Sequence, residues 1–250
     1  MGVFRRYADF YDVYYADKNY AQEVDFVLDL ASRYGNKPKS LLDMGCGTGK
    51  HLAEFRRWGL RCDGFDRSPE MLAQAAKRLS GQDVNLSEGN LTNFESRKYY
   101  DLVVSMFAVM GYLTDNNQLI AGLSTARKHL RQKGLFIFDG WFGPAVLVQQ
   151  PEKRCHQYQD GQDIITRKAT PSLDPARQTT TVHYEVTLSR NGHVVRQIEE
   201  THTMRFMFVQ EMAMAMQAAG LELIHCCPFQ ELDGELTTKS WNVSFVARRK

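Results

Sequence analysis

Residues 41–49, Leu-Leu-Asp-Met-Gly-Cys-Gly-Thr-Gly, decide the fold of this chain. An apolar run ends in an acid, three glycines then alternate with small residues, and a helical pattern opens at Lys50. The stretch predicts a strand, a loop of bare backbone and a helix N-terminus, which together can cradle part of a nucleotide-like ligand. A dinucleotide-binding loop spaces its glycines G-x-G-x-x-G, whereas here the third glycine comes one residue early, at Gly49. The spacing therefore argues against a nicotinamide cofactor.

Strand patterns alternate with helical patterns on both sides of this loop. Strands are expected near 40–44, 60–65, 83–88, 100–106, 134–139, 221–226 and 242–248, and helices near 18–33, 49–58, 68–79, 115–131 and 209–219. Gly59 and Gly134 stand where helices are expected to end. Such alternation predicts an α/β fold in which a doubly wound, mostly parallel seven-stranded sheet has helices on both faces.

The pattern changes between residues 143 and 208. Residues 180–188 show the alternation of a β-strand, with Val182, Tyr184, Val186 and Leu188 on one face. Asn191-Gly192 gives a strong hairpin turn, and Asp160-Gly161 marks another hairpin tip. These features predict an antiparallel β subdomain, inserted at 143–208, whose natural role is to roof the site. Residues 1–142 and 209–250 then form the α/β domain that carries the glycine loop.

Composition narrows the classes of partner. The 250 residues carry a net charge of +2 with acids and bases interspersed, and 43% of them are hydrophobic, which is enough for a sizeable core. A nucleic acid is therefore not expected as a partner, and no apolar stretch is long enough to span a membrane. The five cysteines form no C-x-x-C pair, so neither a disulfide framework nor a metal site is expected. A reducing cytoplasm is the simpler setting.

A second acid follows the strand expected at 60–65. Asp66 comes about twenty residues after the glycine loop, a position from which a carboxylate accepts hydrogen bonds from both hydroxyls of a ribose. The alternative is a capping role beside Ser68, which with Pro69 makes a good helix start. Asp63, inside the same strand, is the weaker candidate.

With Asp43 two residues before its first glycine, the 41–49 stretch resembles the first motif of class I S-adenosylmethionine (SAM) dependent methyltransferases. The alternative is a tight turn without a ligand, although three glycines in five residues cost entropy that a plain turn need not incur. The resemblance implies SAM as the cofactor, with Asp43 at its ammonium group or a bridging water. Asn90 stands where the family commonly has an aspartate for the adenine amino group, and its amide oxygen can still accept that bond. The cofactor-binding residues so implied are Tyr11, Tyr20, Asp43, Gly45, Cys46, Gly47, Gly49, His51, Asp66, Arg67, Met71, Asn90, Leu91, Met106 and Phe107.

Further stretches carry a narrower resemblance: Phe10-Tyr11-Asp12, residues 17–23, Met106-Phe107, Gly111-Tyr112, residues 139–142 and the late His202. Together they look like the bacterial N-methyltransferases that act on the amino group of nucleotide-linked deoxysugars. The resemblance implies a small-molecule acceptor of that class. One departure is Tyr112, because those enzymes often have a histidine there, and a tyrosine with a pKa of about 10 is a poor base at neutral pH.

Candidate acceptor-site residues come from both parts of the chain. Tyr11 and Tyr112 are expected to position the nucleophile, and His202 is either a proton acceptor from the roof or a structural residue. The expected substrate ligands are Tyr14, Trp141, Arg167 and Arg205, with the arginines available to a pyrophosphate. The N-terminal aromatic cluster is either a lid or a helix face packed on the sheet; it comprises Tyr7, Phe10, Tyr11, Tyr14, Tyr15 and Tyr20.

Two other functions stay open at this point. One is SAM-dependent methylation of a hydroxyl or carboxylate on another metabolite, which would need a dedicated base near the methyl group. The other is a non-catalytic SAM-binding module that docks proteins with its roof. A homodimer paired through the exposed insertion is compatible with all three functions.

Overall fold

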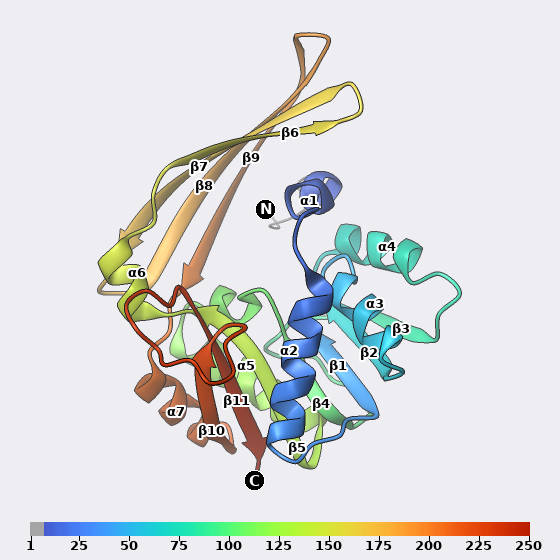
Figure 1. Ribbon diagram of the computed structural model, residues 1–250, viewed down its shortest axis with the longest axis vertical. Helices are drawn as coiled ribbons and strands as arrows, with labels where there is room; N and C mark the ends of the chain where they lie inside the picture. The colour runs from blue at the N-terminus through green and yellow to red at the C-terminus, as the bar shows by residue number, and fades with distance from the viewer. Residues whose placement is uncertain (1–7) are drawn as a thin grey trace.

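The computed structural model describes residues 8–250, so Tyr7 of the aromatic cluster lies outside the described residues. One sheet has the strand order β10-β11-β5-β4-β1-β2-β3 (Figure 1). Strands β1 to β5 pair in parallel, while β11 is antiparallel to both β5 and β10. This confirms the doubly wound, mostly parallel seven-stranded architecture. The strands are β1 (Ser40–Met44), β2 (Arg61–Asp66), β3 (Val84–Glu88), β4 (Tyr100–Ser105), β5 (Leu130–Trp141), β10 (Leu221–Pro228) and β11 (Asn242–Arg249).

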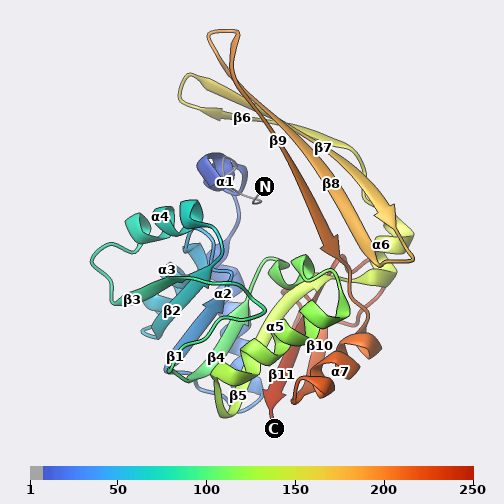
Figure 2. The same ribbon diagram turned by 180° about the vertical axis from the view of Figure 1, so that it is seen from behind.

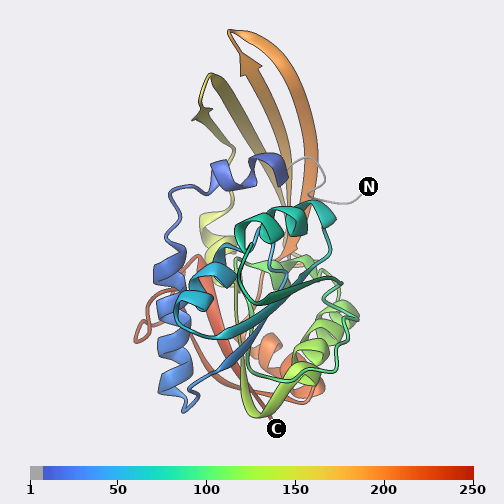
Figure 3. The same ribbon diagram turned by 90° about the vertical axis from the view of Figure 1, so that its right-hand side faces the viewer.

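Helices cover both faces of this sheet, with α2 along one face and α5 along the other (Figure 3). The buried strands contribute side chains to a hydrophobic core on each face of the sheet, because successive side chains point to opposite faces. Leu41 packs with Val27 and Phe55 on the side of α2 and α3, whereas Leu42 packs with Leu119 on the side of α5 and α7. The helices are α2 (Tyr20–Arg33), α3 (Lys50–Arg57), α4 (Pro69–Arg78), α5 (Asn116–His129) and α7 (Val209–Ala218), with a 3-10 turn η1 (Val109–Tyr112).

A second, four-stranded antiparallel sheet with the order β6-β7-β8-β9 rises from the main domain after helix α6 (Gly143–Gln149) (Figure 2). Its strands are β6 (Arg154–Asp160), β7 (Asp163–Asp174), β8 (Thr179–Arg190) and β9 (His193–Arg205). We call this sheet the roof. Helix α1 (Ala8–Tyr14) lies under it, because Phe10 and Tyr14 pack against Ile165, Val186 and Ile198 of the roof.

Turn residues account for the connections of the roof. Asn191 and Gly192 both have positive φ, 50° and 79°, as a type I′ hairpin requires, so the turn predicted between β8 and β9 is confirmed. Gly161, with φ of 60°, likewise joins β6 to β7.

The prediction that Gly134 ends a helix is wrong. Helix α5 ends at His129, and β5 begins at the next residue. Gly134 lies inside β5 just after Lys133, which has a φ of 64°, and a Cβ on Gly134 would come 2.9 Å from the carbonyl oxygen of Arg131. The glycine therefore serves a close backbone approach at an irregular strand start, not a helix end.

Across residues 8–250, none of the helices combines the length and apolar character that crossing a lipid bilayer requires.

Candidate active site

The glycine loop after β1 takes backbone conformations that only glycine adopts easily. Gly45, Gly47 and Gly49 have φ values of 80°, 53° and 76°. A Cβ on Gly45 would lie 2.5 Å from a methyl group of Val109, and Gly49 is the left-handed N-cap of α3. The loop thus presents bare backbone at the carboxyl end of β1, next to η1.

A first cavity of about 370 Å³ opens beside this loop. Asp66, at the end of β2, accepts hydrogen bonds from the backbone N–H groups of Gly47 and Ser68, both at 2.9 Å. Asp66 therefore stabilises the turn into α4 and also lines the cavity. Its capping role and a role in binding a ribose are compatible. Asn90 also lines the cavity, but its amide oxygen already accepts from the N–H and hydroxyl of Thr92. The expected cofactor residues that line this cavity are Tyr11, Gly45, Gly47, Asp66, Arg67, Met71, Asn90 and Leu91.

Two buried polar atoms near the loop have no hydrogen-bond partner within the described part of the chain. They are a carboxylate oxygen of Asp43, which is 1% exposed, and the hydroxyl of Tyr20. Burial, with a smaller contribution from the Asp66 charge, raises the pKa of Asp43 to about 8. Buried polar groups are normally satisfied, so these atoms point to a ligand that supplies a donor to one and an acceptor to the other. Tyr20 makes an edge-to-face contact with His51 of α3, with ring centroids 4.9 Å apart.

Other residues expected at the cofactor lie around this cavity without lining it. Cys46, whose side chain points from the loop into the core, and Met106 are buried, and Phe107 faces a second cavity. Their assignment to the cofactor stays a prediction.

The second cavity, of about 520 Å³, lies between the main domain and the roof. Tyr11, Val109 and Tyr112 line both cavities, so the two spaces meet at these three residues. His202 lines the second cavity, and the structure thereby brings all three expected catalytic side chains to one place. The remaining lining residues are Tyr15, Glu23, Phe107, Ala108, Asp139, Trp141, Arg167, Tyr184, Met204, Phe229, Gln230, Trp241 and Asn242.

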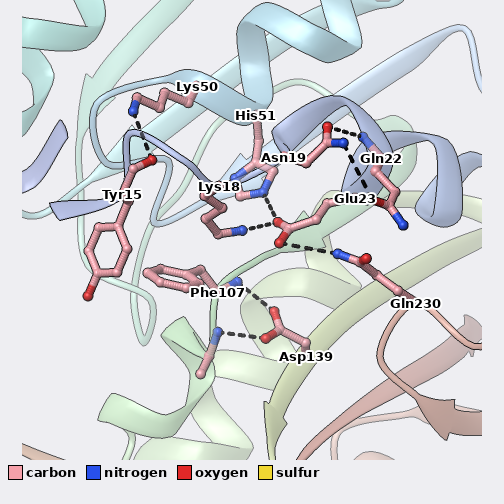
Figure 4. A network of polar contacts seen from close by, with 11 residues as sticks. Tyr15, Lys18, Asn19, Gln22, Glu23, Lys50, His51, Phe107, Asp139 and Gln230 are labelled. Carbon is pink, nitrogen blue, oxygen red and sulfur yellow. Dashed lines mark hydrogen bonds and ion pairs between the residues drawn. The ribbon is translucent and has the colours of Figure 1, made fainter. Parts of the chain in front are cut away.

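Asp139 fixes the backbone that shapes this junction (Figure 4). Its carboxylate accepts from the N–H groups of Phe107 and Ala108, at 2.5 and 3.0 Å. Both residues have positive φ, 69° and 57°, which is strained for residues with side chains. Burial raises the pKa of Asp139 to about 7, although the two N–H donors favour its charged form. Asp139 therefore holds the strained turn that leads into η1.

A polar network from α2 borders the same cavity (Figure 4). Glu23 forms an ion pair with Lys18, a hydrogen bond of 2.7 Å with Nε2 of His51, and accepts a hydrogen bond from Gln230. Burial alone would raise the pKa of Glu23, but the His51 hydrogen bond and the Lys18 charge hold it below its usual range. Burial lowers the pKa of His51 despite the carboxylate beside it.

The roof supplies a histidine and an arginine. The Tyr112 hydroxyl lies 2.7 Å from Nδ1 of His202. The Arg167 guanidinium lies over the rings of Tyr14, Tyr15 and Tyr184, at 4.9, 5.8 and 4.3 Å from their centroids. Cation–π contacts of this kind hold the charge at the cavity wall.

Of the other expected substrate ligands, Trp141 lies at the second cavity and Arg205 does not. Trp141 lines the second cavity beside Trp241, with ring centroids 6.0 Å apart. Arg205 instead pairs with Glu211 and Asn116 and lines a separate cavity at the base of the roof. The structure thus does not bring Arg205 to the site.

Sequence reasoning assigned no role to several residues that line the second cavity, among them Glu23, Asp139 and Tyr184. The available signal for Asp139 was an acid near the end of an otherwise apolar strand, the same signal that marked Asp66. Glu23 entered only as part of the 17–23 stretch, and Tyr184 gave no signal, because their meeting depends on how the roof and α2 are placed.

The comparisons with known proteins match this geometry. Residues 41–134 match the family model of the methyltransferase domain. The chain is 30% identical over 220 residues to the dTDP-3-amino-3,4,6-trideoxy-alpha-D-glucopyranose N,N-dimethyltransferase of Streptomyces venezuelae, covering 87% of this chain and 90% of the relative. The chain belongs to the class I SAM-dependent methyltransferases. Its cofactor is therefore SAM, and its acceptor is a small molecule.

Solved structures agree over nearly the whole chain. The crystal structure of Streptomyces venezuelae DesVI is 27% identical, with a TM-score of 0.80 and coverage of 98% of both chains. The SAM-bound structure of CalS10, an amino pentose methyltransferase from Micromonospora echinaspora, shares the fold, with a TM-score of 0.77, 22% identity and coverage of 100% of this chain and 99% of that one. The roof is therefore a shared part of the fold.

The residues of this methyltransferase fit SAM. The methionine end of SAM carries an ammonium and a carboxylate, and the unpartnered atoms of Asp43 and Tyr20 are an acceptor and a donor. The carboxylate of Asp66 suits a ribose, and Met71 and Leu91 give the first cavity apolar walls. A Cβ on Gly45 would meet Val109, so the loop packs closely on η1 there, whereas Gly47 has open space on its side of the loop.

Proposed function

We propose that this enzyme methylates the amino group of a nucleotide-linked amino deoxysugar of the dTDP type. The observation that carries the proposal is the meeting of two cavities at Tyr11, Val109 and Tyr112. One cavity suits the adenosine of SAM, and the other is roofed, aromatic and large enough for a sugar. The 30% identical relative, which covers the roof as well, is named for such an acceptor.

Methyl transfer from a sulfonium requires the nucleophile, the methyl carbon and the sulfur to be held in line, with water excluded. SAM supplies the electrophilic methyl group. Tyr11 and Tyr112 stand at the junction, where their hydroxyls can hold the acceptor amine toward the first cavity. Burial raises the pKa of both tyrosines well above the usual range, so both remain neutral hydrogen-bonding groups at physiological pH.

Arg167 is the residue proposed for the acceptor's pyrophosphate. Its guanidinium faces the second cavity from β7 and is held by tyrosine rings. Charged hydrogen bonds from a guanidinium to phosphate oxygens are strong and geometrically specific. The same side of the cavity also presents Tyr184, which gives a wall for an apolar sugar face.

The test is a screen of nucleotide-linked amino sugars with SAM, read by mass spectrometry for the gain of one or two methyl units. Tyr11→Phe and Tyr112→Phe are tested singly against the best acceptor. Lower turnover in either variant is expected, and unchanged turnover in both would remove the tyrosines from the mechanism. A wild-type enzyme that binds SAM but methylates no amino sugar would reject the acceptor class.

A hydroxyl acceptor is the second candidate, and the contact between Tyr112 and His202 favours it, because an alcohol needs a base near the methyl group. Including deaminated, hydroxylated sugars in the same screen separates the two. Methylation of the hydroxyl sugar alone would establish this alternative.

The cellular setting and the assembly belong to the same proposal. All five cysteines lie within the described residues as free thiols, which supports a reducing, cytoplasmic setting. The homodimer remains a prediction, and light scattering at micromolar concentration tests it.

A further inference from the structure

A chain of three side chains runs from the cavity junction into the roof. The Tyr112 hydroxyl lies 2.7 Å from Nδ1 of His202, and Nε2 of His202 lies 3.1 Å from a carboxylate oxygen of Glu200. Tyr112 belongs to η1 of the main domain, whereas both other residues belong to β9. Sequence reasoning had considered Tyr112 and His202 separately and had given Glu200 no role.

The strand geometry of β9 explains why its two members act together. Residues two apart on a strand point to the same face, so Glu200 and His202 both face the cavity side of the roof. The side chain of Glu200 is only 10% exposed, and that of His202 only 6%. Tyr184, which pairs with Glu200 in the β8–β9 register, lies in an edge-to-face arrangement with His202 at a centroid distance of 5.2 Å. His202 is therefore held on two sides.

These contacts select one tautomer of His202. An ionised carboxylate only accepts hydrogen bonds, so the contact with Glu200 requires a proton on Nε2. The neutral ring then leaves Nδ1 as an acceptor, and the Tyr112 hydroxyl must donate to it. With its proton directed at His202, the phenolic oxygen turns its lone pairs toward the cavity junction, where the acceptor amine is expected.

We propose that Tyr112, His202 and Glu200 form a proton relay that removes the amine proton, with Glu200 as the positioning residue that sets the His202 tautomer. The relay rests on the proposed function for its substrate, but its geometry does not. A tyrosine alone is a poor base at neutral pH. In the relay Tyr112 can still accept the amine proton, because its own proton moves on to the imidazole of His202.

The sugar ammonium gives an N–H proton to the Tyr112 oxygen as the phenolic proton passes to Nδ1 of His202. The neutral amine nitrogen then forms a bond to the methyl carbon with its lone pair, the carbon–sulfur bond breaks, and its electron pair stays on the sulfur as a neutral thioether. The methylated nitrogen carries the positive charge that the sulfur has lost. The imidazolium is stabilised by the Glu200 carboxylate and releases its proton to solvent when the product leaves.

Other ionisable groups face the relay from each neighbouring element. Tyr184 on β8 and Tyr15 after α1 oppose ionisation of Tyr112, and Arg67 after β2 favours it, while burial has the largest effect on its pKa. Arg167 on β7 lies over the Tyr184 ring. Because burial and the two tyrosines outweigh Arg67 and keep the phenol neutral, the relay passes a proton through Tyr112 without leaving a phenolate.

The first test needs no substrate. Nitrogen-15 NMR of the histidine rings of the ligand-free enzyme, at a pH where the imidazoles are neutral, reports which nitrogen carries the proton, and His202→Gln assigns the signal. The relay requires a protonated Nε2 and a bare Nδ1. A protonated Nδ1 would overturn it.

The second test compares Glu200→Gln with Glu199→Gln, its neighbour on β9, which is exposed and points to the opposite face. The first variant is expected to lower kcat by about 100-fold at neutral pH, with the KM of the acceptor and the Kd of SAM nearly unchanged. The deficit narrows as the pH rises toward about 9, because solvent then removes the amine proton. Glu199→Gln is expected to match wild type. Equal kcat in both variants, or a deficit independent of pH, would overturn the relay.

The two hypotheses fail separately. A wild-type enzyme that methylates no amino sugar, yet shows the Nε2–H tautomer, refutes the acceptor assignment and leaves the relay geometry standing. A wild-type enzyme that methylates an amino sugar as fast as Glu200→Gln does refutes the relay and leaves the proposed function standing.

Discussion

Replacing Asp43 with asparagine is expected to stabilise the ligand-free enzyme while it weakens SAM binding. Folding raises the pKa of this buried carboxyl from an ordinary 3.8 to about 8. Between these two values the folded chain binds a proton that the unfolded chain does not, so stability falls by about 1.4 kcal/mol for each pH unit. At about pH 7 the accumulated cost is of the order of 4 kcal/mol. Asparagine has nearly the same shape and no charge, so Asp43→Asn removes that cost.

Urea denaturation of both proteins from about pH 4 to about pH 8 measures the difference. The variant and wild type should have equal free energies of unfolding near pH 4. As the pH rises, the variant should become increasingly more stable than wild type. Asp63→Asn, the same substitution in the adjacent strand, is the matched control with the opposite sign. Hydrogen bonds from Lys98, Tyr100 and Asn85 hold the pKa of Asp63 below its usual range against the effect of burial, so this variant loses stability at neutral pH. An Asp43→Asn variant that is less stable than wild type at every pH would refute the reasoning.

SAM binding gives the same residue a second readout. If the ammonium of SAM meets Asp43, the carboxyl that is protonated in the free enzyme ionises in the complex and releases a proton. Affinity should then rise by up to about tenfold per pH unit between about pH 6 and about pH 8. Calorimetry in two buffers with different heats of ionisation detects the released proton. Binding without proton release would place the ammonium elsewhere.

Three other outcomes are expected. Gly45→Ala should weaken SAM binding at least tenfold, because its Cβ would lie 2.5 Å from a Val109 methyl group and φ is 80°; calorimetry with unchanged affinity would contradict this. Asp139→Asn should lower kcat, since one N–H of the strained turn loses its acceptor; full activity would show that the turn holds itself. Arg205→Gln should cost about 1–3 kcal/mol by removing charged hydrogen bonds to Glu211 and Asn116, with the acceptor KM unchanged, whereas a raised KM at unchanged stability would return Arg205 to the substrate site.

The sheet could be predicted from the sequence because its determinants are local. The strand expected at 40–44 is observed as Ser40–Met44, since an apolar run followed by glycines admits few other conformations. The Asn191-Gly192 turn could be predicted because Asn and Gly are the residue types that most readily adopt the positive φ found at both positions. The start of β5 was misplaced, because a single glycine does not tell a helix end from a close approach of two backbone segments.

The candidate site was predictable only where one motif contains it. The glycine loop and Asp66 lie within about one strand–helix–strand unit, and both line the first cavity. Tyr112 and His202 are 90 residues apart, and their contact depends on the direction in which the roof rises. Arg205 lies on the same strand as His202, yet it serves a buried ion pair at the base of the roof. Residue type does not encode which distant residues meet in the fold, nor which part of a strand reaches the site. Both are set by tertiary structure.

Helix α1 links the two halves of the site mechanically. Tyr11 lines both cavities, whereas Phe10 and Tyr14 of the same short helix pack on the roof. A molecule in the second cavity therefore meets Tyr11 on a helix whose other side packs on the roof. If Tyr11 holds the acceptor amine as proposed, binding energy from the remote part of the acceptor can be used to orient the reacting atoms.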